Sequence, residues 1–243
     1  MKKLISLMLL LVTPCLQAGV SMLGTRIVYP EASKGVNVEL RNLGEATFIV
    51  QSWVSQFSDD QTSADKVPFV VTPPIAKLVG NQKQKFKISF THQQILPQDR
   101  ESIFYFNFLE VPYSEAVMDN SDGNKLQLTV RHQLKLFYRP EAVQKQTRKI
   151  ARDAVLQTIR NGKNLILRYS NNSPYYLSMS GEAKLQIAER DYFAESTMIA
   201  PYSTHDFVFS DIEPSTSTDT AQLSIYLIND FGASLEEHYD VDL

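Results

Sequence analysis

Apolar and polar side chains alternate along most of this chain, the period expected of β-strands with one face in a core and the other in water. In the first half, this alternation predicts strands at residues 19–29, 36–42, 47–56, 66–72, 85–91, 102–111 and 125–140. In the second half, it predicts strands at 164–170, 174–180, 184–188, 204–210, 221–229 and from about 235 onward. No window of a dozen residues has a convincing helical repeat, so the sequence predicts an all-β fold.

The predicted strands divide the chain into two domains. The first half has seven of them, separated by turn sequences such as Pro73-Pro74 and Gly80-Asn81, which is typical of an immunoglobulin-like β-sandwich. The second half repeats the pattern and predicts a second sandwich. Pro140 has no N–H and a fixed φ, so we do not expect a central strand to continue through it. We therefore predict domains at 19–139 and 140–243.

The start of the chain predicts a secretory signal peptide, residues 1–18. Lys2 and Lys3 precede an apolar run at 4–12, and a short polar stretch ends at Ala18, after which we expect cleavage. The apolar run is too short to cross a bilayer of about 30 Å as a helix. The mature chain is therefore expected to be exported and soluble.

Charge and cysteine content narrow the function classes. The formal net charge is −3, and loss of the two signal lysines takes it to −5. A mildly acidic chain without a basic block argues against binding to nucleic acid and against electrostatic attachment to a membrane. Cys15 is the only cysteine and lies in the predicted signal, so the mature chain has no thiol for a disulfide, a metal or a substrate.

Motifs for catalysis and metal binding are weak throughout. Ser203, Thr204, His205 and Asp206 are residue types of a catalytic triad, but neighbours along a strand point to opposite faces. The polar segment at 114–124, a predicted loop, contains MDNSDGN, which lacks the acidic ligands at both ends of a calcium loop. The four histidines show no ligand spacing. We predict a protein that is not an enzyme and has no cofactor or metal.

The segment KLQLTVRHQLKLFYRP at 125–140 is about twice as long as an ordinary strand. One face, interrupted by His132, is apolar and consists of Leu126, Leu128, Val130, Leu134 and Leu136. In one interpretation, all five side chains face the core of their own sandwich. In the other, the first half of the segment outruns the sandwich and leaves an apolar row on an edge strand, which is an aggregation hazard unless a partner covers it.

Several segments resemble those of the periplasmic pilus chaperones of the chaperone–usher pathway, the PapD-like family. They are GTRIVYP at 24–30, VPFVVTPPIAKL at 67–78, LPQDRESIFYFNFLEVP at 96–112, the segment at 125–140, and YLINDFGA at 226–233. The resemblance extends over essentially the whole mature chain in the right order. It implies two sandwiches in an L or boomerang arrangement with a cleft between them. It also implies a periplasmic location and, as partners, pilus or fimbrial subunits and an outer-membrane usher.

The resemblance further implies donor-strand complementation, in which the chaperone inserts its own long strand into the groove of an incomplete subunit. By position, the pair that binds the subunit's C-terminal carboxylate in the cleft corresponds to Arg26 and Lys135. The alternating residues that fill the groove correspond to Leu126, Leu128 and Val130. The charged cluster across the domain interface corresponds to Glu101, Arg139 and Asp230.

Some alternatives stay open. Lys135 lies on the opposite face of an unbroken strand from the groove-filling residues, so a twist, a bulge or the approach to the hinge has to reconcile the two roles. The loop at 113–124 is longer than expected for the short-loop branch of the family, and the cysteine pair of many long-loop members is absent. Whether the free chain self-associates to hide its edge is also open. From the residues alone, two alternative functions remain: an exported two-domain adhesin or binding module, and a periplasmic hydrolase.

Overall fold

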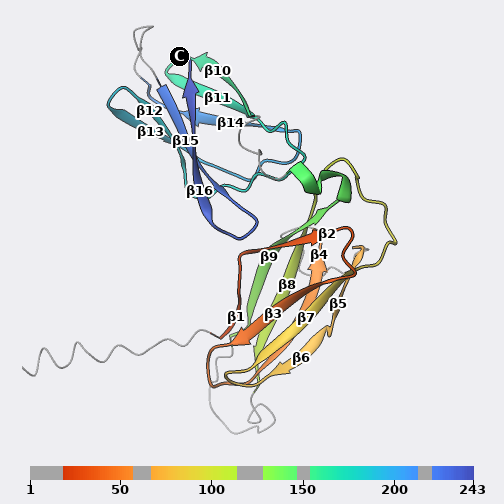
Figure 1. Ribbon diagram of the computed structural model, residues 1–243. Coiled ribbons are helices and arrows are strands. Elements are labelled where there is room, and N and C mark those ends of the chain that lie inside the picture. Colours follow the sequence, from red (N-terminus) through yellow and green to blue (C-terminus); the bar gives the residue numbers. More distant parts are fainter. Residues whose placement is uncertain (1–18, 57–66, 114–127, 147–153, 213–220) are drawn as a thin grey trace, which may run out of the picture.

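The computed structural model describes residues 19–56, 67–113, 128–146, 154–212 and 221–243. These residues form two β-sandwiches, which Figure 1 shows joined end to end at an angle, so that the molecule is bent. The described residues contain no α-helix; a 3₁₀ helix, η2 (Glu141–Gln146), follows the first sandwich. No helix in the described part of the chain has the length and apolar character needed to cross a bilayer. The predicted all-β fold of two immunoglobulin-like sandwiches is confirmed.

The first sandwich packs a four-stranded sheet against a five-stranded sheet. The four-stranded sheet has the order β1 (Val20–Met22), β3 (Val36–Asn42), β7 (Lys83–Phe90), β5 (Phe69–Thr72). The five-stranded sheet has the order β2 (Arg26–Pro30), β9 (Val130–Arg139), β8 (Ser102–Pro112), β4 (Phe48–Ser55), β6 (Ile75–Leu78). Alternate side chains of both sheets meet in one core, whose fully buried members include Tyr29, Phe86 and Phe106.

The second sandwich is built in the same way from two smaller sheets. One has the order β10 (Val155–Asn161), β11 (Asn164–Ser170), β14 (Thr204–Phe209). The other has the order β13 (Arg190–Ala194), β12 (Ala183–Ile187), β15 (Ala221–Ile228), β16 (Ser234–Val241). Its core shares no residue with the first and includes Leu167, Phe207 and Leu223. Between the two sandwiches, β9 ends at Arg139 and η2 begins at Glu141. The domain boundary at 139/140 stays a prediction.

The prediction of one strand at 19–29 is wrong, because this segment serves both sheets of the first sandwich. It leaves the four-stranded sheet after Met22 and joins the five-stranded sheet at Arg26. Between them, Gly24 has a φ of 105°, a conformation that glycine adopts without the steric cost of a Cβ. As a result of this change of sheet, the pairing of β2 with β9 begins only at Lys135.

Other differences from the predicted strands have local causes. The segment at 174–180 forms only isolated bridges, from Leu177 to Ile199 and from Met179 to Leu227. The pattern missed β6 and β13, which are four and five residues long and too short to show a period. It also missed β10, whose side chains are almost all exposed and therefore carry no apolar alternation.

Candidate functional site

Arg26 and Lys135 lie side by side where the first sandwich meets the second. Strands β2 and β9 pair in parallel, and their register sets Arg26 directly opposite Lys135. Residues that are opposite in register project from the same face of a sheet. Both side chains are half-buried. The structure therefore brings together the two cations that the sequence predicted as a pair.

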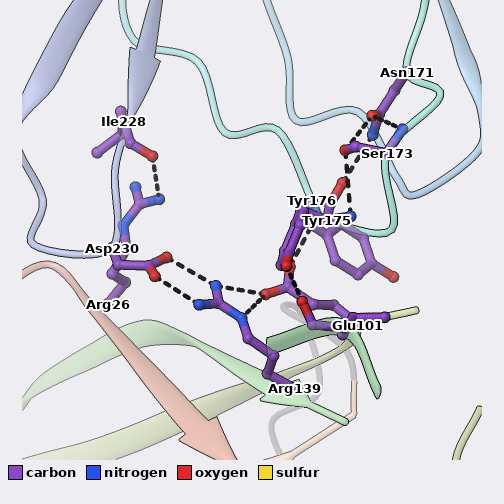
Figure 2. Close-up of polar contacts among 10 residues, drawn as sticks. Arg26, Glu101, Arg139, Asn171, Ser173, Tyr175, Tyr176, Ile228 and Asp230 are labelled. Atoms are coloured by element: carbon purple, nitrogen blue, oxygen red, sulfur yellow. Dashed lines mark hydrogen bonds and ion pairs between the residues drawn. The ribbon is translucent and has the colours of Figure 1, made fainter. Parts of the chain in front are cut away.

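Arg26 reaches from the first sandwich to the second. Its Nη1 donates a hydrogen bond to the carbonyl oxygen of Ile228 at the end of β15, at 2.9 Å (Figure 2). The guanidinium carbon lies 6.0 Å from the ring centroid of Phe137. The Nε of Arg26 is buried and has no hydrogen-bond partner among the described residues. A buried N–H without an acceptor is costly, so the position of Arg26 is not explained by hydrogen bonding within the described part of the chain alone.

The electrostatics of the pair favour an incoming anion. Burial lowers the pKa of Arg26, an effect that the charges of Asp230 and Glu101 oppose. Burial, and then the charge of Arg26, lower the pKa of Lys135. In the described part of the chain, the ammonium group of Lys135 has neither a hydrogen bond nor an ion pair. Because burial disfavours the charged form of both side chains, an anion bound between them would stabilise both charges.

Arg139 is held between two carboxylates from different sandwiches. Its Nε donates to Oε1 of Glu101 at 2.7 Å, and its Nη1 and Nη2 donate to the two carboxylate oxygens of Asp230 at 2.6 and 2.9 Å (Figure 2). Burial works against the charge of Arg139, but the hydrogen bonds to Asp230 and the charges of both acids outweigh it and raise the pKa. A planar guanidinium with five donors suits this arrangement. The predicted cluster of Glu101, Arg139 and Asp230 is thus assembled in the structure.

Glu101 also holds a loop of the second sandwich. Its Oε2 accepts a hydrogen bond from the backbone N–H of Tyr176 at 2.9 Å, and its own N–H donates to the carbonyl oxygen of Pro174 at 2.9 Å. The ring of Tyr175 lies 5.0 Å from the guanidinium carbon of Arg139, and its hydroxyl donates to the carbonyl oxygen of Val143 in η2. These contacts fix the angle between the sandwiches close to Arg26 and Lys135.

A further contact between the sandwiches was not predicted from the sequence. The turn between β15 and β16 places Gly232, with a φ of 86°, against Thr25, the residue before Arg26. A Cβ added to Gly232 would come within 2.6 Å of the Thr25 hydroxyl. Asn229 stabilises the turn by accepting hydrogen bonds from the N–H groups of Phe231 and Ala233, each at 3.0 Å. The glycine after NDF was the only sequence signal for this close approach.

Strand β9 has one open edge. Its pairing with β8 runs without interruption from Val130 opposite Glu110 to Tyr138 opposite Ser102. Its pairing with β2 on the other side begins only at Lys135, because the preceding residues of the chain have crossed to β3. Along residues 130–134, the edge away from β8 therefore has no strand partner among the described residues.

The apolar side chains of the segment at 125–140 are buried to different degrees along its length. Leu128 is 67% exposed and Val130 is 44% exposed, whereas Leu134 packs against the core and Leu136 is fully buried. Between them, the ring of His132 stacks on Phe108 with centroids 4.4 Å apart. The interpretation in which all the apolar residues face their own core is therefore wrong for Leu128 and Val130. Leu126 lies outside the described residues.

Two family models match almost all of the described chain. The model for the N-terminal domain of PapD, a pili and flagellar-assembly chaperone, matches residues 19–144. The model for the C-terminal domain of the pili assembly chaperone PapD matches residues 152–239. This chain belongs to the PapD family of pilus-assembly chaperones.

Several proteins similar to this chain are named as chaperones. An Escherichia coli K12 protein, "Probable fimbrial chaperone YadV", is 34% identical over 90% of this chain and 88% of the relative. The chaperone protein HifB of Haemophilus influenzae is 33% identical over 90% of this chain and 86% of the relative. The crystal structure of the YadV chaperone superimposes with a TM-score of 0.75 at 32% identity, over 92% of this chain and 100% of the other.

A solved complex shares the fold of this chaperone. The Salmonella enterica chaperone SafB, crystallised with the SafA pilin, has a TM-score of 0.69 at 22% identity over 92% of this chain and 96% of the matched chain. At that identity the likeness concerns the fold.

The residues that resembled a catalytic triad in the sequence make structural contacts. Asp206 pairs with Arg168 through two hydrogen bonds of 2.8 Å, His205 packs edge-on against Phe207, and the Ser203 hydroxyl donates to a backbone carbonyl. These contacts do not form a proton relay. The described residues contain no group of three or more histidines, cysteines or acids that could hold a metal ion. The MDNSDGN segment lies outside the described residues.

Proposed function

We propose that this chaperone binds pilus or fimbrial subunits in the periplasm and delivers them to an outer-membrane usher. Family membership supports the class of activity, and the predicted signal peptide supports the location. A pilin is also the partner with which the SafB chain of the same fold was crystallised. The single observation that carries the proposal is the open edge of β9, which leads directly to Arg26 and Lys135.

The open edge supplies the donor strand. The edge of β9 away from β8, which no described strand pairs with before Lys135, can add a strand of another protein, while Leu128 and Val130 present apolar side chains to its groove. Leu126 would extend the row. Complete burial of three aliphatic side chains contributes roughly 5–9 kcal/mol, an upper value because Leu128 and Val130 are already partly covered in the free chain.

The cation pair supplies the anchor for the subunit's C-terminal carboxylate. The guanidinium of Arg26 and the ammonium group of Lys135 together offer the carboxylate charge-assisted hydrogen bonds of roughly 1.5–3 kcal/mol each, before desolvation. The anchor also fixes the register, since a slip of one residue would turn every apolar side chain of the donor strand away from the groove.

The anchor also fixes the direction of the bound strand. Strand β9 runs from Val130 toward Lys135, and a subunit strand that ends in its carboxylate at Lys135 must run the same way. The two strands therefore pair in parallel, which is slightly less stable per residue than antiparallel pairing. We infer that the subunit is held short of its most stable packing. A segment of a neighbouring subunit can then replace β9 without ATP.

Co-expression with a candidate subunit tests this proposal. Arg26→Ala and Lys135→Ala are expected to lower recovery of a one-to-one complex from the periplasm at least tenfold, with unchanged circular dichroism of the free chain. The matched controls are Arg41→Ala and Lys85→Ala, which remove exposed cations from β3 and β7 of the same sandwich. Equal recovery for the cleft variants and the controls would contradict the anchor.

A further inference from the structure

The carboxylate of Glu110 lies buried at the point where the mature chain is predicted to begin. Glu110 is 6% exposed, and its Oε2 accepts a hydrogen bond from the backbone N–H of Val20 at 2.6 Å. A Cβ added to Gly19 would come within 2.5 Å of the same oxygen. The nitrogen of Gly19 is bonded to the same Cα as that Cβ, so it lies within about 5 Å of the carboxylate.

Glu110 has no permanently charged partner in the described part of the chain. Its ion-pair partner there is His132, whose Nε2 lies 3.2 Å from Oε1 and which is charged only when protonated. A buried carboxylate without a counter-charge is costly. Cleavage after Ala18 would turn the amide nitrogen of Gly19 into an α-ammonium group, which is largely protonated at neutral pH. Processing would therefore create the missing cation at this site.

The site lies next to the first residue of β9, on the side of that strand that pairs with β8 and one strand away from the open edge. Glu110 is opposite Val130 in the β8–β9 pairing, and Val130 is the first residue of β9. On the four-stranded sheet, the same N-terminal residues form β1, with Val20 opposite Asn42 of β3. Glu110 thus holds the start of β1 near the start of β9, while β1 itself pairs with the other sheet.

The register of β2 shows what β1 would do if it were released. Arg26 is opposite Lys135 in the parallel β2–β9 pairing. Continued backward without the bend, the same register would set Thr25 opposite Leu134 and Ser21 opposite Val130. Residues 21–25 would then cover the edge that is open in the structure. The chain's own N-terminal segment is therefore a competitor for the donor edge.

We propose that Glu110 binds the α-ammonium group of Gly19 in the processed chain, and that this contact holds β1 on β3 and keeps the edge of β9 open. The first half of the proposal is independent of what β9 binds. The second half rests on the proposed function, because an open edge matters only if a subunit occupies it.

A double-mutant cycle on the unfolding equilibrium tests the ammonium site. One chain begins at Gly19. The other begins one residue earlier, at Ala18, which moves the ammonium group about 3.6 Å away from Glu110. Each of the two chains is made with and without Glu110→Gln. The extra residue is expected to raise the unfolding constant about 10- to 100-fold when Glu110 is present, and to have little effect with Glu110→Gln. Glu39→Gln is the matched control, since Glu39 is a half-exposed carboxylate of the same sandwich paired with Lys83 at 3.1 Å; it should leave the effect of the extra residue intact.

Two results would overturn the ammonium site. One is an extra residue that lowers stability equally with and without Glu110→Gln; the other is an exported chain whose measured mass shows that it does not begin at Gly19.

Subunit capture tests the second half of the proposal, the link between the ammonium site and the open edge. The extended chain is expected to capture several-fold less subunit at equal native fluorescence of Trp53, and equal capture would refute the link to the edge. Failure of the chain that begins at Gly19 to capture any subunit would refute the proposed function and not the ammonium site, because the stability cycle uses no subunit.

Discussion

Removing Arg139 is the most direct test of how the interdomain cluster supports the fold. Arg139→Met keeps the length and apolar stem of the side chain but leaves the Glu101 carboxylate without its cation. Glu101 is only 3% exposed and would retain one strong donor, the backbone N–H of Tyr176. Loss of one partner from a buried ion pair typically costs 3–5 kcal/mol. Because the Tyr176 bond remains, we expect about 3 kcal/mol.

Two companion variants separate the contributions of the acids. Asp230 is the more exposed acid, with 43% of its side chain accessible, so Asp230→Asn should cost about 1 kcal/mol or less. In the double variant Glu101→Leu with Arg139→Met, no uncompensated charge is buried, and we expect it to recover at least half of the loss caused by Arg139→Met alone.

Urea unfolding followed by tryptophan fluorescence provides the assay. Trp53 is the only tryptophan and lies on β4, so its emission reports the first sandwich, which contains both Glu101 and Arg139. The expected result is a lower midpoint with an unchanged slope. A loss below about 1 kcal/mol for Arg139→Met, or a double variant less stable than the single one, would refute the view that an uncompensated Glu101 charge dominates the cost.

Three further predictions concern the donor edge, the cleft and the contact between sandwiches. Val130→Asp should reduce subunit capture more than tenfold without altering circular dichroism, whereas Val70→Asp, at a similarly exposed position on β5, should not. Burial, and then the neighbouring guanidinium, lower the pKa of Lys135, so its charge costs folding free energy at neutral pH. Lys135→Met should therefore stabilise the free chain in urea titrations, and this gain should vanish above about pH 10.4, where the lysine is neutral in the unfolded chain too. Gly232→Ala should destabilise the chain by about 1–2 kcal/mol more than Gly181→Ala, because both glycines have positive φ but only Gly232 lacks room for a Cβ. Thermal unfolding of the two variants measures the difference. Equal losses of stability would contradict the prediction.

The strands that the sequence predicted best are those whose side chains alternate between core and water. The segment at 36–42 is recovered as β3 with the predicted bounds, since its inward side chains are buried and its outward ones are not. The segment at 19–29 looked like one strand because both of its halves alternate. Only Gly24 marks the change of sheet, and a glycine inside an apparent strand is equally typical of a bulge or of a close approach by another backbone.

The residues of the candidate site were identifiable only through the family resemblance. Their contacts depend on register and on the angle between the sandwiches, which local patterns do not encode. The opposite directions of Lys135 and Val130 illustrate this point. The pairing of β9 with β8 has no bulge, so the two side chains do stay on opposite faces. The change from open edge to paired edge at Lys135, which the sequence pattern does not show, separates Val130 from Lys135 along the strand and is compatible with the two proposed roles.

The three cations at the junction between the sandwiches differ in their partners and in the direction of their pKa shifts. This difference helps to separate a structural role from a binding role. Arg139 has two carboxylates, and its pKa is raised. Arg26 and Lys135 donate no direct hydrogen bond to either acid, and their pKa values are lowered by burial. A junction selected only for stability would pair these two cations or replace them with apolar side chains. Their partial burial without a direct hydrogen bond to a carboxylate therefore supports the proposal that they bind the C-terminal carboxylate of a subunit.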